Sequence, residues 1–460
     1  MLALRTLLPV AYMAALASAL AATIGSDHAL ALSTAPGYSF SHIIRQPDAT
    51  YIAPHFDSLD IPVGGRVVVS ALDGSQNVTY TGARSNFYAE YVRGDAAVVT
   101  YYPPKFTTDD ETTTAVAFSI DRFASGFPQG NANVEAICGN DDTKAIVCVK
   151  ASDPAKYKAA QAVGRLLIGG NSLCTGWLFG SEGHVITNNH CIGDAATAAN
   201  IQFEFGAECK TCDDPNNVQQ LACPGETVAS SAKFVYTNIA ADFTLVKLNL
   251  KSGVDLTKYG YLQARESGPV LNEPIYIPQH PAGKPTRIAT VLDNGSIGTV
   301  ESFSINTCSS DEIGYTLDTE PGASGSPVLS AKENVVVGLH NCGGCLNGAI
   351  KIDKVVAELK SRGYLPANAV VGGGPSPSTP SPSPTTPNPT SPVTPKPTPS
   401  TPTPPKTTKA TPTPPSTTPV SGCGSCSFCY YPGGHSCLTD FSKNDCDNFS
   451  ASFGTFWCGK

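Results

Sequence analysis

The stretch GASGSP at residues 322–327 decides how this chain is interpreted, because it places Ser324 in a turn of small residues. Gly322 lets the backbone bend so that its own N–H and that of Ser324 can point at one developing oxyanion. Two earlier runs complete the pattern, TNNHC at 187–191 and ADFTL at 241–245. In chain order, the three runs offer a base, an acid and a nucleophile.

These three residue types have a common chemical use. A serine hydroxyl is a poor nucleophile at neutral pH, so a neutral imidazole must accept its proton during attack and return it to the leaving amine. We predict this role for His190, and for Asp242 the role of the carboxylate that fixes the imidazole tautomer. With Ser324 as nucleophile and the N–H groups of Gly322 and Ser324 as oxyanion hole, the pattern predicts peptide-bond hydrolysis without a cofactor or metal ion.

Residues 138–360 resemble the secreted trypsin-like serine proteases, and within them most closely the lysyl and glutamyl endopeptidases. The resemblance implies two chymotrypsin-like β-barrels over 138–364, in a mainly β chain, and the triad His190, Asp242 and Ser324. Asparagines at 188 and 189 depart from the small residues common there, and we expect them not to affect the chemistry. The matching stretches are CTGWL (174–178), ITNNHC (186–191), DFTL (242–245), TEPGASGSP (319–327) and VGLH (337–340).

The resemblance also bears on the substrate residue before the scissile bond. Asp318 lies six residues before Ser324, where trypsins carry the acid of the specificity pocket, so we expect cleavage after Lys or Arg. Cleavage after Glu is the alternative, because Thr319 and His340 match positions that read glutamate in glutamyl endopeptidases. A third hypothesis is a catalytically silent, protease-like binding or decoy protein, although decoys usually lack a triad member.

Sixteen cysteines are typical of an oxidising compartment. Ten lie between Cys138 and Cys345, and six lie between residues 423 and 458, so each region can close its own disulfides. The resemblance implies a bridge between Cys174 and Cys191, on either side of the strand that delivers His190. It also implies bridges from Cys138 and Cys148 into the barrel, toward the Cys342/Cys345 pair and the 209–223 cluster. Zinc at the Cys-x-x-Cys pairs is a less favoured interpretation.

Two segments precede this domain. Residues 1–21 contain one basic residue, an apolar stretch and small residues near the end, which predicts a cleaved signal peptide and a secreted, extracellular protein. Residues 34–134 predict a small β-sandwich, because strand-like runs alternate there with turn signals. We interpret it as a prosegment removed on maturation, with a permanent accessory domain as alternative. The runs are 51–53, 66–69, 77–80, 97–102 and 114–118.

The C-terminal part changes composition. Apolar residues at helical spacing over 350–362 predict a helix that closes the catalytic domain near Tyr364. Residues 366–421 are mainly Pro, Thr and Ser, which predicts a disordered linker. Residues 422–460 form a small disulfide-rich module with little core. Its aromatic residues suggest a polysaccharide or cell-wall ligand, or else a miniature core; they are Phe428, Tyr430, Tyr431, Phe453, Phe456 and Trp457.

The net charge of −8 argues against nucleic acid or an anionic membrane surface as partner, which leaves protein or peptide substrates. No apolar stretch after residue 21 is long enough to cross a bilayer. Asn-x-Ser/Thr sequons make the chain a candidate glycoprotein, and they lie at Asn77, Asn294 and Asn448. Three further histidines lie in no catalytic pattern and are expected at the surface or in turns: His184, His280 and His435.

Overall fold

The computed structural model describes residues 21–105, 116–128 and 137–371, and, near the C-terminus, 429–431, 436–438, 443, 446 and 456–458. The chain divides into two compact units, residues 1–376 and 377–460. The first unit is mainly β, as predicted, and holds a sandwich followed by two barrel-type sheets. The predicted signal peptide and nearly all of the linker lie outside the described residues.

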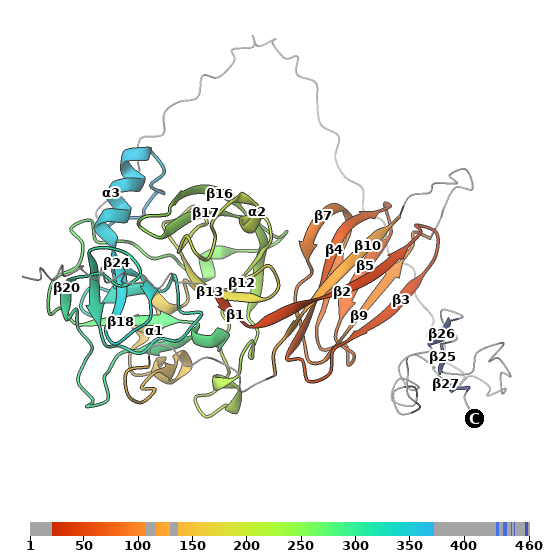
Figure 1. Cartoon of the computed structure of the whole chain (residues 1–460), viewed down its shortest axis with the longest axis horizontal. Coiled ribbons are helices and arrows are strands. Elements are labelled where there is room, and N and C mark those ends of the chain that lie inside the picture. Colours follow the sequence, from red (N-terminus) through yellow and green to blue (C-terminus); the bar gives the residue numbers. More distant parts are fainter. Residues whose placement is uncertain are drawn as a thin grey trace, which may run out of the picture. The chain divides into compact units, whose positions relative to one another are not determined.

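A β-sandwich forms the N-terminal part of the first unit (Figure 1). One sheet has the order β2-β10-β4-β7, with β8 paired to β4, and the other has the order β3-β9-β5-β6. Apolar side chains of both sheets share one buried cluster. The strands are β2 (Gly25–Thr34), β3 (Phe40–Arg45), β4 (Tyr51–Ile61), β5 (Arg66–Ser70), β6 (Asn77–Tyr80), β7 (Gly82–Tyr88), β8 (Val92–Arg93), β9 (Ala96–Tyr102) and β10 (Phe118–Gly126).

The sandwich confirms four of the five predicted strand runs. The run at 114–118 is wrong in extent, because β10 starts only at Phe118 and continues to Gly126. The region also begins earlier than residue 34, since β2 occupies Gly25–Thr34. Its small alanine and serine side chains give β2 a weak apolar alternation, so the sequence pattern hides it.

A closed six-stranded barrel follows. Its strands run in the order β13-β12-β15-β16-β17-β14, and β14 pairs back with β13. Short β1 (Ala22–Thr23) extends this sheet by pairing with β13. The barrel strands are β12 (Val163–Ile168), β13 (Ser172–Leu178), β14 (His184–Thr187), β15 (Ile201–Phe205), β16 (Glu226–Asn238) and β17 (Phe243–Leu250). Trp177 and Phe203 are fully buried in its core.

The second barrel-type sheet has the order β11-β19-β18-β22-β23-β24-β21-β20. Its strands are β11 (Lys144–Ala145), β18 (Ile275–Gln279), β19 (Arg287–Ala289), β20 (Ser302–Ile305), β21 (Glu312–Tyr315), β22 (Pro327–Ser330), β23 (Val336–Cys342) and β24 (Asn347–Lys351). The predicted closing helix is confirmed as α3 (Ile352–Arg362), which buries Ile352, Val355 and Leu359. It ends at Gly363, whose φ of 72° suits the left-handed C-terminal cap.

Short helices connect these strands: η1 (Ile146–Val149), α1 (Pro154–Ala160), α2 (Ala195–Ala198), η2 (Pro215–Val218), η3 (Leu256–Lys258) and η4 (Pro281–Gly283). The chain stays packed beyond Tyr364, where Ala369 accepts a hydrogen bond from the backbone N–H of Ala264. No helix of the described residues is long and apolar enough to span a membrane.

Five disulfides use all ten cysteines between Cys138 and Cys345, as the even count predicts. The bridge implied between Cys174 and Cys191 is confirmed. The expected bridges into the barrel are also present, from Cys138 to Cys345 and from Cys148 into the 209–223 cluster. Because both Cys-x-x-Cys pairs are consumed by bridges, disulfides rather than zinc explain them. The remaining pairs are Cys148–Cys212, Cys209–Cys223 and Cys308–Cys342.

The described part of the second unit is a three-stranded sheet of order β26-β25-β27. Its strands are β25 (Cys429–Tyr431), β26 (Ser436–Leu438) and β27 (Phe456–Trp457). Cys446 and Cys458 each take part in a disulfide. Phe428, Phe453, His435 and Asn448 lie outside the described residues, so the polysaccharide ligand stays a prediction. Of the other sequons, the Asn77 and Asn294 side chains are exposed.

Candidate active site

His190 and Asp242 contact each other through two hydrogen bonds, His190 just after β14 and Asp242 just before β17 of the closed barrel. The Nδ1 atom of His190 lies 2.8 Å from Oδ2 of Asp242, and the backbone N–H of His190 donates to Oδ1 at 3.0 Å. Both side chains are nearly buried, with 9% and 12% exposed. Because a carboxylate only accepts hydrogen bonds, Nδ1 carries the proton and Nε2 is left as the basic atom.

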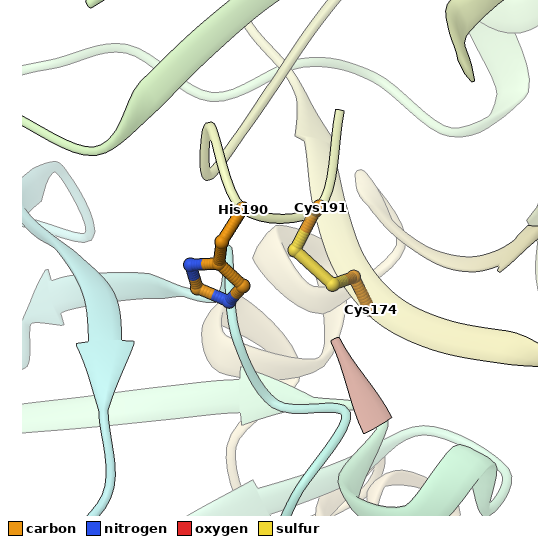
Figure 2. A group of neighbouring side chains, drawn as sticks. All are labelled: Cys174, His190 and Cys191. Atoms are coloured by element: carbon orange, nitrogen blue, oxygen red, sulfur yellow. A yellow bond between two sulfur atoms is a disulfide. The ribbon is translucent and has the colours of Figure 1, made fainter. Parts of the chain in front are cut away.

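Local structure explains how His190 is placed. It follows β14 in a turn, and the neighbouring Cys191 is bridged to Cys174 on β13 (Figure 2). The bridge ties the His190 turn to the strand that runs beneath it. It closes a loop of sequence separation 17, for which loop-closure entropy gives about 3 kcal/mol of stabilisation. The turn therefore has little freedom to drift away from Asp242.

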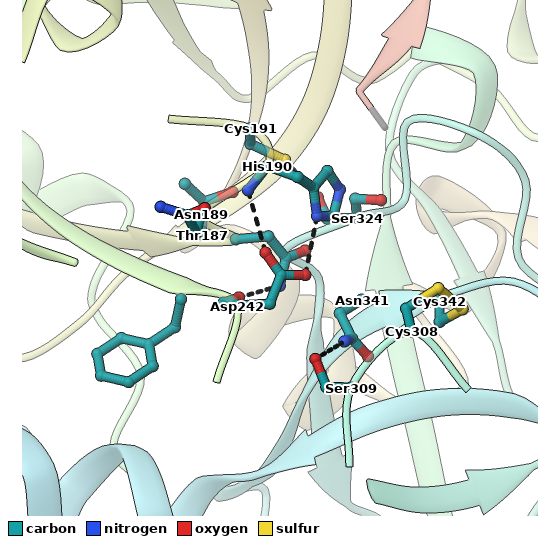
Figure 3. A network of polar contacts seen from close by, with 12 residues as sticks. Thr187, Asn189, His190, Cys191, Asp242, Cys308, Ser309, Ser324, Asn341 and Cys342 are labelled. Atoms are coloured by element: carbon teal, nitrogen blue, oxygen red, sulfur yellow. Dashed lines mark hydrogen bonds and ion pairs between the residues drawn. A yellow bond between two sulfur atoms is a disulfide. The ribbon is translucent and has the colours of Figure 1, made fainter. Parts of the chain in front are cut away.

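Asp242 stands one residue before β17 in an unusual backbone conformation, with φ of 44°. A non-glycine residue in this left-handed region costs about 1 kcal/mol and has to be held by its surroundings. Two bonds hold it: its N–H donates to the carbonyl of Ile239, and its carbonyl accepts from Nδ2 of Asn188 at 2.9 Å. The carboxylate then faces His190 (Figure 3).

Ser324 sits in a turn that only small residues can build. A side chain at Gly325 would come within 2.1 Å of the carbonyl oxygen of Thr175, and φ is positive at both Gly322 and Gly325. Thr175 also fastens the turn, since its N–H donates to the Ser324 carbonyl at 2.8 Å and its hydroxyl donates to the Gly322 carbonyl at 2.8 Å. The half-buried Ser324 is therefore positioned from β13.

The amide groups of this turn are used unequally. The N–H of Ala323 donates to Glu320, that of Gly325 to His340 and that of Ser326 to Ala323. Within the described residues, the N–H groups of Gly322 and Ser324 donate to no backbone carbonyl. These are the two groups predicted for an oxyanion hole, and they remain available to an acceptor.

Ser324 lies beside His190, and Sγ of Cys191 is 3.9 Å from the carbonyl oxygen of Ser324 (Figure 3). The buried Nε2 atom of His190 has no hydrogen-bond partner among the described residues, so no hydrogen bond joins it to Oγ of Ser324. The structure thus brings the three predicted residues together, with the base–acid contact formed and the base–nucleophile contact open. Such contacts are often loose before substrate binds.

The predicted specificity residues are all buried beside the turn. Both oxygens of Asp318 accept backbone N–H groups at 3.0 and 2.9 Å, from Cys138 and Asp142, and burial raises the pKa of this carboxyl group. Thr319 Oγ1 lies 3.2 Å from Oδ1 of Asn347. Asp318 therefore anchors the 138–142 segment, whatever else it does.

His340 is buried in the same region and contacts Tyr315, whose hydroxyl is 2.6 Å from Nδ1 of His340. Burial lowers the pKa of His340 to about 3. A group that keeps its neutral form at physiological pH can donate a hydrogen bond but offers no positive charge. His340 could therefore read a carboxylate only as a neutral donor.

Some residues have roles that the sequence did not reveal. Thr175 fastens the Ser324 turn, and the expectation that Asn188 leaves the chemistry untouched is not supported by its bond to the Asp242 carbonyl. His280 is in a turn, as expected, but it is fully buried, and His184 is buried on β14. No sequence signal distinguishes Thr175 and Asn188, because the carbonyl groups that they bind, of Gly322 and Asp242, lie more than fifty positions away.

A family model described as a trypsin-like peptidase domain matches residues 174–339. The matched range contains His190, Asp242 and Ser324. Most of the first barrel and much of the second thus form a trypsin-like peptidase domain, the class to which the candidate triad also points. The finer placement near the lysyl and glutamyl endopeptidases has no counterpart in this match.

One relative matches this chain over most of its length, and this match shows the family. "Secreted RxLR effector protein 73" of Plasmopara viticola is 41% identical over 345 residues, which cover 72% of this chain and 84% of the relative. The chain belongs to the same family as this protein. Because the aligned length exceeds that of the peptidase domain, the relationship extends beyond the barrels.

Solved structures that match part of this chain include the HtrA-type protease AlgW with tripeptide, at 19% identity and a TM-score of 0.33. The match covers 46% of this chain and 62% of the AlgW chain. Deg5 matches at 18% identity and a TM-score of 0.34, over 47% of this chain and 97% of Deg5. The inactive form of the Rv3671c protease matches at 13% identity and a TM-score of 0.33, over 46% and 94%.

Proposed function

We propose that the chain is an extracellular serine endopeptidase whose triad is His190, Asp242 and Ser324. The observation that carries the proposal is the two-point contact between Asp242 and His190, because it leaves Nε2 as an acceptor beside Ser324. The trypsin-like peptidase domain supports the same class. The secreted relative and the five disulfides support an oxidising, extracellular location.

The reaction follows from these positions. Nε2 of His190 accepts the proton of the Ser324 hydroxyl as Oγ bonds to the substrate carbonyl carbon, and the carbonyl oxygen becomes an oxyanion. The free N–H groups of Gly322 and Ser324 stabilise that charge. When the C–N bond breaks, Nε2 returns the proton to the leaving amine. Water then attacks the acyl-enzyme by the same route and releases Ser324.

The test is labelling and turnover of the full secreted chain. Wild-type protein should react with a fluorophosphonate probe and hydrolyse a peptide library, whereas Ser324→Ala should lose both, with kcat lower by about 10⁶-fold. Ser326→Ala is the matched control, because Ser326 lies in the same turn but bonds to the Ala323 carbonyl. Wild-type protein that is folded but takes no probe would instead support a silent binding protein or decoy.

The preferred substrate residue is the finer part of the proposal. Cleavage after Lys or Arg would require Asp318 to bind a substrate cation with oxygens that already accept two backbone N–H groups. That bonding favours the second candidate, cleavage after Glu, in which the neutral His340 would donate to the substrate carboxylate and Thr319 would turn its hydroxyl hydrogen to it from Asn347. Both assignments concern the substrate residue before the scissile bond, so a single substrate series separates them.

The series compares peptides that differ only in Lys, Arg, Glu or Gln before the scissile bond. If Asp318 reads the substrate, Asp318→Ser should reduce kcat/KM for Lys and Arg peptides by at least about a hundredfold. If His340 and Thr319 read it, Thr319→Val should reduce kcat/KM for the Glu peptide more than for the Gln peptide, because a hydrogen bond to a charged acceptor is the stronger one. Unaltered selectivity in both variants would place the specificity elsewhere.

A further inference from the structure

The N-terminal sandwich and the closed barrel meet in a continuous, buried contact within the first unit. Strand β1 pairs with β13, with Ala22 opposite Leu173. One apolar cluster contains residues of both parts, including Tyr51 and Leu167. The Tyr51 hydroxyl donates to the carbonyl of Gly170 at 2.8 Å. The sandwich is thus joined to the barrel by backbone pairing, apolar packing and side-chain hydrogen bonds.

One contact across this boundary reaches a buried ion pair. Arg165 on β12 and Glu204 on β15 are 1% and 4% exposed, and Nη2 of Arg165 lies 2.8 Å from Oε2 of Glu204. Tyr91 of the sandwich completes the pair. Its hydroxyl accepts from Nη2 of Arg165 at 3.1 Å and donates toward the Glu204 carboxylate at 3.2 Å.

Because the Tyr91 hydroxyl is buried, its hydrogen bonds to the ion pair matter for the position of Arg165. Burial is the main reason that the pKa of Tyr91 is raised, so the hydroxyl stays protonated and can donate and accept at once. A buried guanidinium needs a partner for each of its N–H groups, and a missing partner is expensive because water cannot replace it. The sandwich therefore helps to fix the orientation of the Arg165 side chain.

The same guanidinium holds a turn next to the candidate oxyanion hole. Nη1 of Arg165 donates to the carbonyl of Gly283 at 2.8 Å, within η4. Two successive residues of this turn have positive φ, 50° at Ala282 and 69° at Gly283. Because Ala282 is not a glycine, the turn is strained and depends on outside bonds. Arg165 supplies one of those bonds.

The 281–283 turn also supports the Ser324 turn. The N–H of Ala282 donates to the carbonyl of Pro321 at 2.7 Å, directly before Gly322. A side-chain carbon built on Gly322 would lie only 3.2 Å from the His280 carbonyl, so the two turns are in close contact. A continuous series of bonds therefore runs from Tyr91 through Arg165 and the 281–283 turn to Gly322.

We propose that Tyr91 is a positioning residue for the Ser324 turn, whose Gly322 and Ser324 N–H groups form the candidate oxyanion hole. The N-terminal sandwich is then a working part of the peptidase rather than a prosegment that is removed. The proposal rests on the proposed function, since it assigns the sandwich a role in that reaction. Without Tyr91, Arg165 holds Gly283 less firmly, and the N–H of Gly322 spends less time aimed at the oxyanion. Substrate binding does not need this alignment, but the transition state does.

The decisive variant is Tyr91→Phe, which removes the hydroxyl and keeps the ring. We expect kcat to fall by about tenfold with KM unchanged, less than the 10²- to 10³-fold loss caused by removing an oxyanion donor outright. Tyr51→Phe is the matched control, because it removes one hydroxyl bond across the same boundary without touching Arg165. Equal losses of kcat in both variants would overturn the proposal, since they would show only a loosened boundary.

A second measurement keeps this test separate from that of the proposed function. Amide hydrogen exchange at Ala282 and Gly283 is compared in Ser324→Ala protein with and without Tyr91→Phe, so no turnover is needed. We expect faster exchange in the double variant and not with Tyr51→Phe; unchanged exchange overturns the proposal, even if wild-type protein proves inactive. A third measurement is the mass of the probe-labelled wild-type protein, which shows whether the active form retains the sandwich. Fully active protein that lacks residues 22–127 would also overturn the proposal.

Discussion

Replacing Asp242 with Asn tests the orienting role of this carboxylate without changing its shape. One oxygen of Asp242 accepts the backbone N–H of His190 at 3.0 Å, and that N–H can only donate. The amide oxygen of Asn must therefore take this place, which turns its NH₂ group toward Nδ1 at the 2.8 Å contact. Nδ1 then has to accept, so the proton moves to Nε2. The ring can no longer take a proton from Ser324.

We expect kcat to fall about 10⁴-fold, as in serine proteases generally, which corresponds to about 5.4 kcal/mol of transition-state stabilisation. The assay measures kcat on the best peptide of the library, with active sites counted by fluorophosphonate labelling. Asp255→Asn is the matched control, because Asp255 is exposed and only caps η3. If Asp242→Asn kept more than about a tenth of wild-type kcat, the two-contact reasoning would be refuted.

Two further predictions concern stability. Burial lowers the pKa of His280 to about 3 from 6.5, so between these values the unfolded chain binds a proton that the folded chain does not. The free energy of unfolding should fall with acidification by up to about 1.4 kcal/mol per pH unit, and urea unfolding of His280→Asn should show a shallower dependence; equal slopes would contradict this. Cys174→Ser with Cys191→Ser should cost about 3 kcal/mol and lower kcat, whereas Cys209→Ser with Cys223→Ser should cost a similar amount with little effect on kcat. Equal kcat in both double variants would argue against local support of the catalytic turn.

The positions of the candidate triad could be predicted from the sequence because each depends on a local pattern. A turn that exposes Ser324 and leaves two amides free needs small residues on both sides. This requirement is visible in the six consecutive residues 322–327. Strand alternation likewise marks β5, β9 and β17. The even cysteine count predicts closed disulfide sets, although it does not select partners.

Features that depend on distant partners could not be predicted. The buried pair of Arg165 and Glu204 looks like two ordinary charges on strands, and only the register of β12 against β15 brings them together. Nothing near Tyr91 shows that its hydroxyl completes this pair. The spacing of Asp318 gives its place before Ser324 but not the direction of its carboxylate. Direction is set by the 138–142 segment, which arrives from nearly 180 positions away.

Asn188 shows how a departure from a family pattern can carry a function. Its side chain is fully buried, and its Oδ1 has no partner among the described residues, an arrangement that costs about 1–3 kcal/mol. In return, Nδ2 donates to the carbonyl of Asp242 at 2.9 Å and helps to hold the left-handed backbone there. A smaller residue at 188 would avoid the cost and lose the support.

We therefore expect Asn188→Ala to lower kcat about tenfold while the free energy of unfolding changes little, because the lost bond and the relieved Oδ1 offset each other. Asn189→Ala is the matched control, since the Asn189 amide bonds to Thr237 rather than to Asp242. Kinetics and urea unfolding are measured on both variants. A kcat for Asn188→Ala equal to that of Asn189→Ala would show that the backbone of Asp242 holds its conformation unaided, and that the bond from Asn188 only fills space.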